Sequence, residues 1–506
     1  MKRVNIVGAG TAGLAAAVRL QSDGYDVHLY EKNEKVGGKM YQINEEGYRF
    51  DVGPTIVMTP EIYNEVFEYA GVDPKDYIPM KKLDPMMALT YRDGTSIQMS
   101  NDLVELFETL EGIDEEDASG FLKYLSNIYE RYLVAKNKIL NRSYRKLGDF
   151  INPKGLIDIY RLKTFDNAYD EMSKYIDNDY IKKMFAFQTL YIGIAPNSGP
   201  SLYNMIPMME LLYGIWHIEG GMYSMAKGMA RLFEELGGQI HLNSNVEEVI
   251  IENKKATGIR VNGQEIPADY TVVNADFPYA MTNLIPDEKN RGKYTDQKVD
   301  NMDYSCSCFI LYLGVDKEYP TDSVHNFYMA EDFDKNIADI FETGTPPDDP
   351  SIYVFNVSKA DETLAPDGKQ AFYALIPVPD LSLYNEWTEE NVQKYRDRVL
   401  EVLSQFEPFQ DLSDHIDFER IYTPKMFEEH FNAYNGATFG LRPTLFQSAY
   451  FRPHNKFDYA DNLYFCGSSV HPGAGVPTVL QSAKLSVEEL LKDDKKSADV
   501  SVISKT

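Results

Sequence analysis

The sequence predicts an α/β fold in which a Rossmann-like, dinucleotide-binding domain is interleaved with an α+β substrate domain. Three observations lead to this prediction. A glycine-rich turn, Gly8-Ala-Gly10-Thr-Ala-Gly13, directly follows the apolar run Val4-Asn-Ile-Val7. An acidic residue, Glu31, ends a second strand-like run at roughly the ~20-residue spacing of a dinucleotide fingerprint. A further strand, a glycine loop and a helix-like run occupy residues 462–491.

The N-terminal segment has the parts that hold a nucleotide diphosphate. Gly8 permits a tight turn, Gly10 lets the backbone approach a pyrophosphate, and Gly13 lets the next helix pack on the sheet. That helix is expected at Ala12–Gln21, and its N-terminus presents unpaired N–H groups to phosphate oxygens. Glu31 is expected to accept hydrogen bonds from the ribose hydroxyls, which favours NAD or FAD over NADP.

Two further motifs favour FAD over NAD. The runs Gly37-Gly38-Lys39 and Phe50-Asp-Val-Gly53-Pro54-Thr55 resemble the FAD-dependent superfamily of glutathione-reductase-like and amine-oxidase-like proteins. In that superfamily a glycine pair and a basic residue run beneath the flavin. The resemblance implies an FAD-binding Rossmann-like domain of the glutathione-reductase/amine-oxidase type. We expect Lys39 to stabilise the reduced, anionic flavin, the alternative being a surface lysine.

The C-terminal part is expected to close the cofactor site. A strand ends at Gly467, and a loop with alternating glycines leads into the helix-like run Thr478–Leu491, whose N-terminus forms a second anion site. The predicted FAD-binding residues are Gly8, Gly10, Thr11, Ala12, Gly13, Glu31, Lys32, Gly38, Lys39, Gly53, Pro54, Thr55, Val246, Gly467, Gly473, Gly475, Val476 and Pro477.

The pieces of the two domains alternate along the chain. Residues 1–58, 218–276 and 423–492 are predicted to form the FAD-binding domain. Residues 59–217 and 277–422 are predicted to form the substrate domain, and the polar residues 493–506 a disordered tail. Because both substrate segments leave the nucleotide-binding domain near strand ends, where ligands collect, we expect the catalytic face at the domain junction.

Local patterns predict the elements in order. Residues 61–216 are expected to be helical, with periodic stretches at 117–137 and 168–190. A glycine turn at 220–221 begins an amphipathic helix that ends at 237–238. Strands are predicted at 239–242, 246–252, 257–261, 270–273, 308–313, 351–357 and 371–377, with a hairpin turn at 262–263 and a helix at 389–406.

The uncharged run Met184–Met209 is the most apolar part of the chain. Pro196, Pro200 and Pro207 interrupt it and exclude a continuous membrane-spanning helix. Two interpretations are open. The run is either a buried core loop with two short helices, or an apolar patch that lines a substrate tunnel or dips into a bilayer.

Composition excludes several functional classes. The chain has 506 residues, enough for two domains, and a formal net charge of −28, which disfavours nucleic acid and anionic membrane surfaces. Its three cysteines provide neither a disulfide framework nor a metal site, and we interpret Cys306 and Cys308 as core residues. This cysteine usage favours a reducing cytoplasm. We also expect no secretory leader and no membrane span.

The chain resembles the bacterial carotenoid desaturases over essentially its whole length. The runs that carry this resemblance, beside the opening glycines, are 50–58, 187–193, 220–223 and 471–477. The runs 423–427, 437–444 and 448–453 are similar to the C30 branch of that family, the dehydrosqualene (4,4′-diapophytoene) desaturases. The resemblance implies an FAD-dependent oxidoreductase that introduces double bonds into a C30 isoprenoid hydrocarbon, giving 4,4′-diaponeurosporene-type polyenes.

Such a desaturation transfers a hydride to flavin N5 and a proton to a base, because no side chain accepts a hydride. Glu219 and His471 are the two candidates for the base, since either could lie near the flavin. The alternatives are a helix-start carboxylate for Glu219 and a loop-packing residue for His471. Cys466 lies near the position where some amine oxidases tether flavin, but the preceding residues differ, so we predict non-covalent FAD.

The resemblance also has consequences for partners. An insoluble C30 substrate must be drawn from lipid, so we expect peripheral association with the inner face of the cell membrane. The final electron acceptor, oxygen or a quinone, and the number of desaturation steps stay open. Two alternatives also stay open: a terminal-methyl carotenoid oxidase or isomerase of the same family, and a non-enzymatic isoprenoid-binding protein of the same fold.

Overall fold

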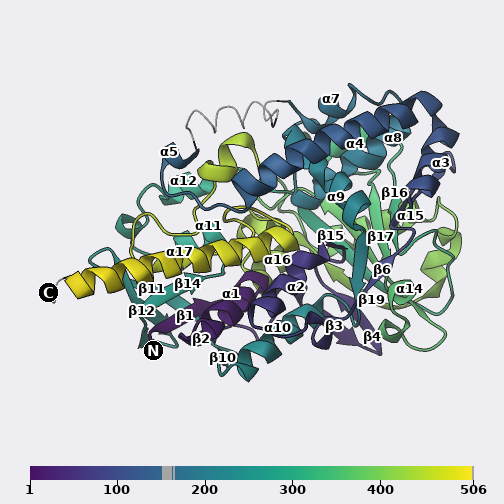
Figure 1. Cartoon of the computed structure of the whole chain (residues 1–506). Helices are drawn as coiled ribbons and strands as arrows, with labels where there is room; N and C mark the ends of the chain where they lie inside the picture. The colour runs from purple at the N-terminus through teal and green to yellow at the C-terminus, as the bar shows by residue number, and fades with distance from the viewer. Residues whose placement is uncertain (151–161, 163–165, 504–506) are drawn as a thin grey trace.

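The structure is a computed structural model that describes residues 1–150, 162 and 166–503. Its largest elements are two sheets (Figure 1). A five-stranded sheet lies toward the end of the molecule where both termini are found, and a seven-stranded sheet lies on the other side. No helix among the described residues is long and apolar enough to cross a bilayer.

The five-stranded sheet is parallel and confirms the predicted Rossmann-like topology. Its strand order is β10-β2-β1-β14-β20. Helix α1 (Thr11–Ser22) packs against α10 (Tyr223–Glu235) and α17 (Val476–Ile503), and its buried alanines allow close contact with them. The strands are β1 (Arg3–Val7), β2 (Asp26–Tyr30), β10 (Gln239–His241), β14 (Tyr270–Val273) and β20 (Leu463–Phe465).

Three small sheets accompany these two. The hairpin turn predicted between β12 and β13 is confirmed, because Asn262 (φ 50°) and Gly263 (φ 73°) both have positive φ, as a type I′ turn requires. The three sheets comprise β11 (Val246–Glu252), β12 (Lys255–Val261) and β13 (Gln264–Pro267); β3 (Gln42–Glu45) and β4 (Tyr48–Asp51); and β5 (Val57–Met58), β9 (Ile215–Ile218) and β6 (Met80–Leu83).

The seven-stranded sheet has both faces covered. Along its strand β15 (Ser307–Val315), the odd-numbered residues Phe309, Leu311 and Leu313 pack with α15 (Glu389–Leu403). The even-numbered residues face a larger core that includes helices α4 (Glu115–Ala135) and α8 (Asp179–Ala186). The other strands, in sheet order around β15, are β19 (Ile416–Tyr422), β18 (Gln370–Val378), β17 (Ile352–Asn356), β16 (His325–Tyr328), β7 (Met87–Thr90) and β8 (Ser96–Met99).

The segment 61–216 is not as purely helical as predicted. It contributes strands β6 to β9, and β7 joins the seven-stranded sheet beside β16. These strands have four residues each, too few for a period-2 pattern to stand out. The periodic stretch 168–190 is also divided, because Asn178 caps a new helix by accepting from the N–H groups of Tyr180 and Ile181.

The remaining helices belong mostly to the second domain, and α3, α4, α7 and α8 lie together in the upper part of Figure 1. These helices are α2 (Pro60–Tyr69), α3 (Leu103–Ile113), α4 (Glu115–Ala135), α5 (Leu147–Phe150), α7 (Ala168–Met172), α8 (Asp179–Ala186), α9 (Met205–Tyr213), α11 (Phe277–Tyr279), α12 (Asp296–Asp300), α13 (Phe333–Ala338), α14 (Val357–Ala360) and α16 (Pro424–Phe431).

Helix α2 packs with the nucleotide-binding domain, although it begins after residue 58, where the first segment of that domain was predicted to end. Helix α2 contacts α1 and α17, and its residues Tyr63, Val66 and Phe67 are buried in the same core as β1 and α1. Tertiary packing therefore assigns the start of the predicted segment 59–217 to the nucleotide-binding side.

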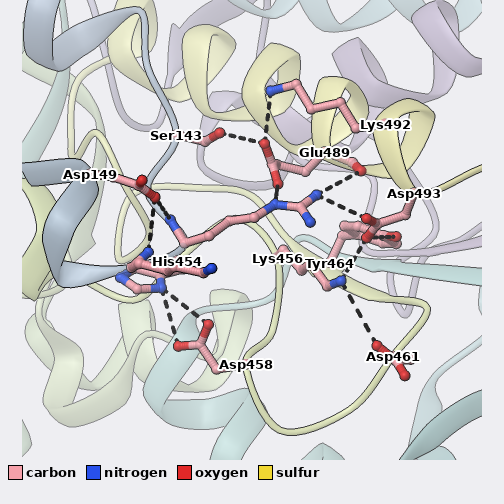
Figure 2. A network of polar contacts seen from close by, with 12 residues as sticks. Ser143, Asp149, His454, Lys456, Asp458, Asp461, Tyr464, Glu489, Lys492 and Asp493 are labelled. Atoms are coloured by element: carbon pink, nitrogen blue, oxygen red, sulfur yellow. Dashed lines mark hydrogen bonds and ion pairs between the residues drawn. The ribbon is translucent and has the colours of Figure 1, made fainter. Parts of the chain in front are cut away.

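Helix α17 continues to Ile503, into the residues from 493 onward that were predicted to form a disordered tail. Asp493 forms ion pairs with Arg145 (3.0 Å) and Lys456 (2.7 Å) and accepts a hydrogen bond from the Tyr464 hydroxyl (3.1 Å). Figure 2 shows Asp493 beside Lys456 and Tyr464. One turn earlier, the buried Glu489 also binds Arg145. These long-range partners hold a stretch whose composition alone suggested disorder.

Candidate functional site

A cavity of about 1360 Å³ lies between the two domains. The volume exceeds the roughly 300–1,000 Å³ of a usual ligand pocket, so more than one ligand can be accommodated. Its walls come from the carboxyl ends of β1 and β14, from strands β15 to β18, and from helix α9. All of the predicted FAD-binding residues except Gly13 line it. The position agrees with the predicted domain junction.

Gly13 lies just behind the wall and has the packing role expected of it. A Cβ atom at this position would lie 2.0 Å from the carbonyl oxygen of Gly8, so only glycine lets α1 approach the turn. The N–H of Gly13 donates to Oδ1 of Asn274 (2.8 Å), and the Asn274 amide donates to the carbonyl of Cys466 (3.1 Å). Asn274 thus joins the glycine turn, β14 and the loop after β20.

Glu31 follows β2 and is 5% exposed. Its two carboxylate oxygens accept N–H groups from Ala9 (2.8 Å) and Asn33 (2.9 Å). These bonds hold the carboxylate against the glycine turn while it still lines the cavity beside Ser244 and Val246. A carboxylate has about four lone-pair sites, so capacity is left for a pair of ligand hydroxyls.

Lys39 faces the cavity from the glycine-pair segment. Its ammonium donates to the carbonyl of Thr438 (2.7 Å), the one hydrogen bond that it makes among the described residues. Loss of solvent around the ammonium lowers the pKa of Lys39, while the charge of Asp276 acts in the opposite direction. A desolvated ammonium with unused donors is suited to an anionic partner in the cavity.

The C-terminal loop is braced by a buried arginine. Arg452 is 1% exposed and donates to four backbone carbonyls, those of Leu441, Gln447, Ser468 and Val470. Burial lowers its pKa to about 10. Arg452 therefore holds the strand end at 467–470 against the loop 441–447, and both segments contribute to the cavity wall.

The residues at this end of the cavity fit a flavin dinucleotide. No side chain caps the N-terminus of α1, and the N-terminal residues of α17 also line the cavity. Two helix N-termini therefore offer partial positive charge and N–H groups to a diphosphate. Glu31 would hold the ribose, and Lys39 would lie where negative charge needs stabilising.

The other end of the cavity is apolar and explains the run Met184–Met209. Residues of this run face the cavity, so the interpretation as the lining of a tunnel agrees with the structure. Strands β16 to β18 supply the facing wall. The apolar residues that line this end are Leu190, Ile192, Leu202, Met205, Ile206, Met209, Phe327, Met329, Phe333, Ile352 and Leu375.

The structure does not support either predicted base. Glu219 is exposed and does not line the cavity. It is not the helix-start carboxylate either, because Asp51 of β4 accepts the N–H groups of Met222 (2.6 Å) and Tyr223 (3.1 Å) at the start of α10. The β9 strand directs Ile218 into the core, and Glu219 falls on the solvent side of the following turn.

His471 is a packing residue behind the cavity wall. It is 1% exposed, its Nε2 lies 2.9 Å from the carbonyl of Arg142, and its ring packs edge-on against Tyr144. Burial lowers its pKa to about 4, so the ring is neutral at physiological pH and Nε2–H donates to that carbonyl. This geometry agrees with the alternative interpretation of His471, as a residue that packs the loop.

Several cavity residues escaped sequence reasoning. Asn274 and Asp276 follow β14 directly, and their place at a parallel strand end was the available signal. Asp276 accepts from the N–H of Tyr434 (3.0 Å) and from the hydroxyl of Ser469. Thr55 was predicted, but its hydroxyl partner Tyr353 was not, because no local pattern relates the loop before β5 to strand β17, about 300 residues later.

Comparison with known proteins identifies the family. A family model described as "Flavin containing amine oxidoreductase" matches residues 11–491. A 4,4′-diapophytoene desaturase (4,4′-diaponeurosporene-forming) of Staphylococcus haemolyticus (strain JCSC1435) is 45% identical, over 97% of this chain and 99% of its own. The protein of the same name from Staphylococcus aureus (strain Newman) is 44% identical, again over 97% and 99%.

Solved structures agree on the fold. An oxidoreductase from Methanosarcina mazei superposes with a TM-score of 0.66 at 16% identity, covering 96% of this chain and 100% of that one. Putrescine oxidase bound to putrescine superposes with a TM-score of 0.63 at 14% identity, covering 97% and 99%. The chain therefore belongs to the flavin-containing amine oxidoreductase family, in the carotenoid desaturase branch related to the 4,4′-diapophytoene desaturases.

Proposed function

We propose that this protein is an FAD-dependent desaturase that converts 4,4′-diapophytoene (dehydrosqualene) into 4,4′-diaponeurosporene-type polyenes. The observation that carries the proposal is identity of 45% over nearly the whole chain with a diapophytoene desaturase, together with a cavity that joins a dinucleotide site to an apolar channel. A C30 hydrocarbon has no polar group, so apolar walls are the recognition it needs.

The flavin supplies the hydride acceptor that side chains lack. The protein chain positions the polyene substrate and excludes water from the site. Apolar residues such as Met205, Met209 and Phe327 would hold the polyene in register, so that a chosen methylene lies over the reactive ring. Lys39 would stabilise negative charge that develops on the ring during reduction.

We further propose that FAD is bound without a covalent link. Cys466 is 0% exposed and does not line the cavity. Cys308 does line it, but burial raises the pKa of its thiol to about 12. A protonated thiol is a poor nucleophile, so neither side chain is prepared to attach to the flavin. Denaturation followed by filtration should release all of the yellow cofactor, and pigment retained on the protein would contradict this.

The activity is tested by co-expression with a dehydrosqualene-producing synthase in a colourless host. We expect extracted pigment with new visible bands and a mass lowered by pairs of hydrogen atoms, with no oxygen added. The synthase alone is the control. An oxygenated product formed only from a preformed carotenoid would identify a terminal-methyl oxidase, and an unchanged C30 chain with flavin bound would overturn the substrate assignment.

We propose that the substrate enters from a bilayer, with the protein lying on the inner face of the cell membrane. Phe446 is 75% exposed and Phe451 is 40% exposed, and both line the cavity, so an apolar rim lies next to the channel. Wild-type protein should float with liposomes, and Phe446→Ser should weaken this several-fold. Leu383→Ser is the matched control, because Leu383 is 50% exposed but does not line the cavity. Equal flotation of the three proteins would exclude this rim as the membrane contact.

A further inference from the structure

A chain of hydroxyl and imidazole groups leads away from the apolar half of the cavity into the core. The Tyr353 hydroxyl lies 2.6 Å from Oγ1 of Thr55 and 2.7 Å from Nδ1 of His325. Thr55 and Tyr353 line the cavity, whereas His325 is 0% exposed and lies behind them. Nε2 of His325 has no hydrogen-bond partner among the described residues.

The two strands that carry this chain hold it in a defined geometry. In the antiparallel pair β16 and β17, His325 lies opposite Phe355, and Phe327 lies opposite Tyr353. Because side chains alternate along a strand, these four rings share one face. The Phe355 ring stacks on His325 at 5.1 Å, and Phe327 stacks on Tyr353 at 4.9 Å. The aromatic packing fixes both polar rings in one arrangement.

The carboxylates that line the described part of the cavity wall are engaged elsewhere. Glu31 binds the glycine turn, Asp276 binds Tyr434 and Ser469, and Asp166 pairs with Lys174 (2.9 Å). None of them leads from the apolar channel to a buried acceptor. The groups of Thr55, Tyr353 and His325 do lead from the apolar channel to a buried acceptor. A buried imidazole with an unpaired nitrogen also calls for an explanation.

We propose that Tyr353 and His325 form the proton relay of the desaturation, with Thr55 positioning the Tyr353 hydroxyl. This inference rests on the proposed function. When the hydride has left the substrate, the C–H bond next to the allylic cation breaks and its electron pair forms the new C=C bond. The proton passes to the Tyr353 oxygen while the original Tyr353 proton moves to Nδ1 of His325. The hydride acceptor is the flavin of the proposed function.

The weak basicity of His325 is compatible with this role. Burial, with a smaller effect of the nearby His217, lowers the pKa of His325 to about 3, so the ring is neutral and Nδ1 can accept a proton. A C–H group beside an allylic cation is a far stronger acid than an ordinary hydrocarbon, so a weak base suffices. A weak base also releases the proton readily, back through Tyr353 toward the cavity.

The relay requires a definite tautomer, which can be measured without substrate or flavin. Thr55 must donate to the Tyr353 oxygen, Tyr353 must donate to Nδ1 of His325, and Nε2 must carry the ring proton. In 15N-histidine NMR of the flavin-free protein, with the signal assigned by its loss in His325→Gln, we expect an unprotonated Nδ1 from pH 5 to pH 8. Tyr353→Phe should shift that signal. A proton on Nδ1 of the resting protein would overturn the relay.

A single-turnover experiment tests the chemistry. Tyr353→Phe and His325→Gln should each slow formation of the desaturated product in a single turnover by about 100-fold, the lower end of the range for loss of a proton-transfer group, and the double variant should be no slower. The dissociation constant for FAD should change less than twofold. Tyr124→Phe is the matched control, because it removes a buried hydroxyl that lies away from the cavity in the same core.

The outcomes separate the relay from the proposed function. Wild-type desaturation with product formation at the wild-type rate in both Tyr353→Phe and His325→Gln would overturn the relay and leave the desaturase standing. Product formation that slows only in proportion to lost flavin occupancy would also overturn it, since that result indicates a structural role. A wild-type protein that yields no desaturated C30 product would overturn both.

Discussion

The N–H of Gly13 donates a 2.8 Å hydrogen bond to Oδ1 of Asn274, which lies 261 residues later in the chain. The side-chain amide of Asn274 then donates to the carbonyl of Cys466. One asparagine therefore connects three chain segments that the predicted domain pattern separates. Its position at the end of β14 places it at the point where the cofactor diphosphate is expected.

Replacing Asn274 with alanine should weaken both the fold and cofactor binding. The change leaves the Gly13 N–H and the Cys466 carbonyl without this partner, at a cost of about 2–3 kcal/mol in the free energy of unfolding. We expect FAD to bind at least about 10-fold more weakly by fluorescence titration, since the glycine turn loses its brace. Asn283→Ala, at an exposed position, is the control. Unchanged FAD affinity in Asn274→Ala would contradict the bracing role.

Gly13→Ala should abolish FAD binding or the fold itself. The added Cβ would lie 2.0 Å from the Gly8 carbonyl oxygen, so α1 would have to move away from the turn. Gly112→Ala provides the matched control. Its Cβ would meet nothing within 4 Å, and Gly112 lies in helix α3, where alanine is favoured by up to about 1 kcal/mol. Thermal unfolding of both variants, with bound flavin measured by its visible absorbance, distinguishes the two effects.

Lys39→Met should stabilise the flavin-free protein and lower its affinity for FAD. A lysine whose pKa is lowered in the fold binds its proton more weakly there than in the unfolded chain. Wild-type stability should therefore rise as the pH approaches 10.5, and the methionine variant should lack this rise. We expect about 1 kcal/mol of stabilisation at pH 7 and a 10- to 100-fold loss of FAD affinity. The exposed Lys293→Met is the control, and tighter FAD binding in Lys39→Met would refute the assignment.

Glu210 should make the protein less stable as the pH rises. It is 0% exposed and lies near Gln188 and Tyr353, and burial raises its pKa from 4.5 to about 8. Between these values the folded state keeps a proton that the unfolded state has lost, so the free energy of unfolding falls with pH. The difference reaches up to about 5 kcal/mol at pH 8, from 1.36 kcal/mol per pKa unit.

Glu210→Gln removes the titrating group and nearly preserves the shape. Urea unfolding at pH 5, 6.5 and 8 should show a declining free energy of unfolding for the wild type, and a decline smaller by several kcal/mol for the variant. The exposed Glu234→Gln is the control and should follow the wild type. Parallel curves for wild type and Glu210→Gln would show that the carboxyl is ionised in the folded state.

The end of α17 should contribute to stability as far as residue 494. Asp493 binds Arg145 and Lys456, and Asp494 accepts hydrogen bonds from the hydroxyls of Tyr25 (2.7 Å) and Tyr270 (2.8 Å). Truncation after Lys492 should lower the unfolding temperature by several degrees, as expected for a loss of about 1–2 kcal/mol. Truncation after Asp494 should have a smaller effect, and equal effects would place the stabilising contacts beyond residue 494.

The parts of the fold that were predicted correctly carry strong local signals. Strand β11 and strand β14 have the predicted bounds, because each is a short β-branched run between turn residues. The glycine turn before α1 was equally clear, because the chemistry of the turn requires glycine at defined positions. The strands β6 to β9 were missed because each has only four residues, and β16 and β5, which pair with β7 and β9, lie far away in the sequence.

The same contrast separates the two halves of the site. The sequence by itself determined where a flavin dinucleotide would lie, because glycine turns, strand ends and helix N-termini are local devices with fixed spacing. Only the tertiary structure decided which polar groups lie beside the apolar half of the cavity. Thr55, His325 and Tyr353 come from three separate segments and meet because two strands pair and a loop from about 300 residues earlier packs over them. Tertiary structure likewise removed Glu219 and His471 from consideration, since burial and direction depend on packing that no local pattern encodes.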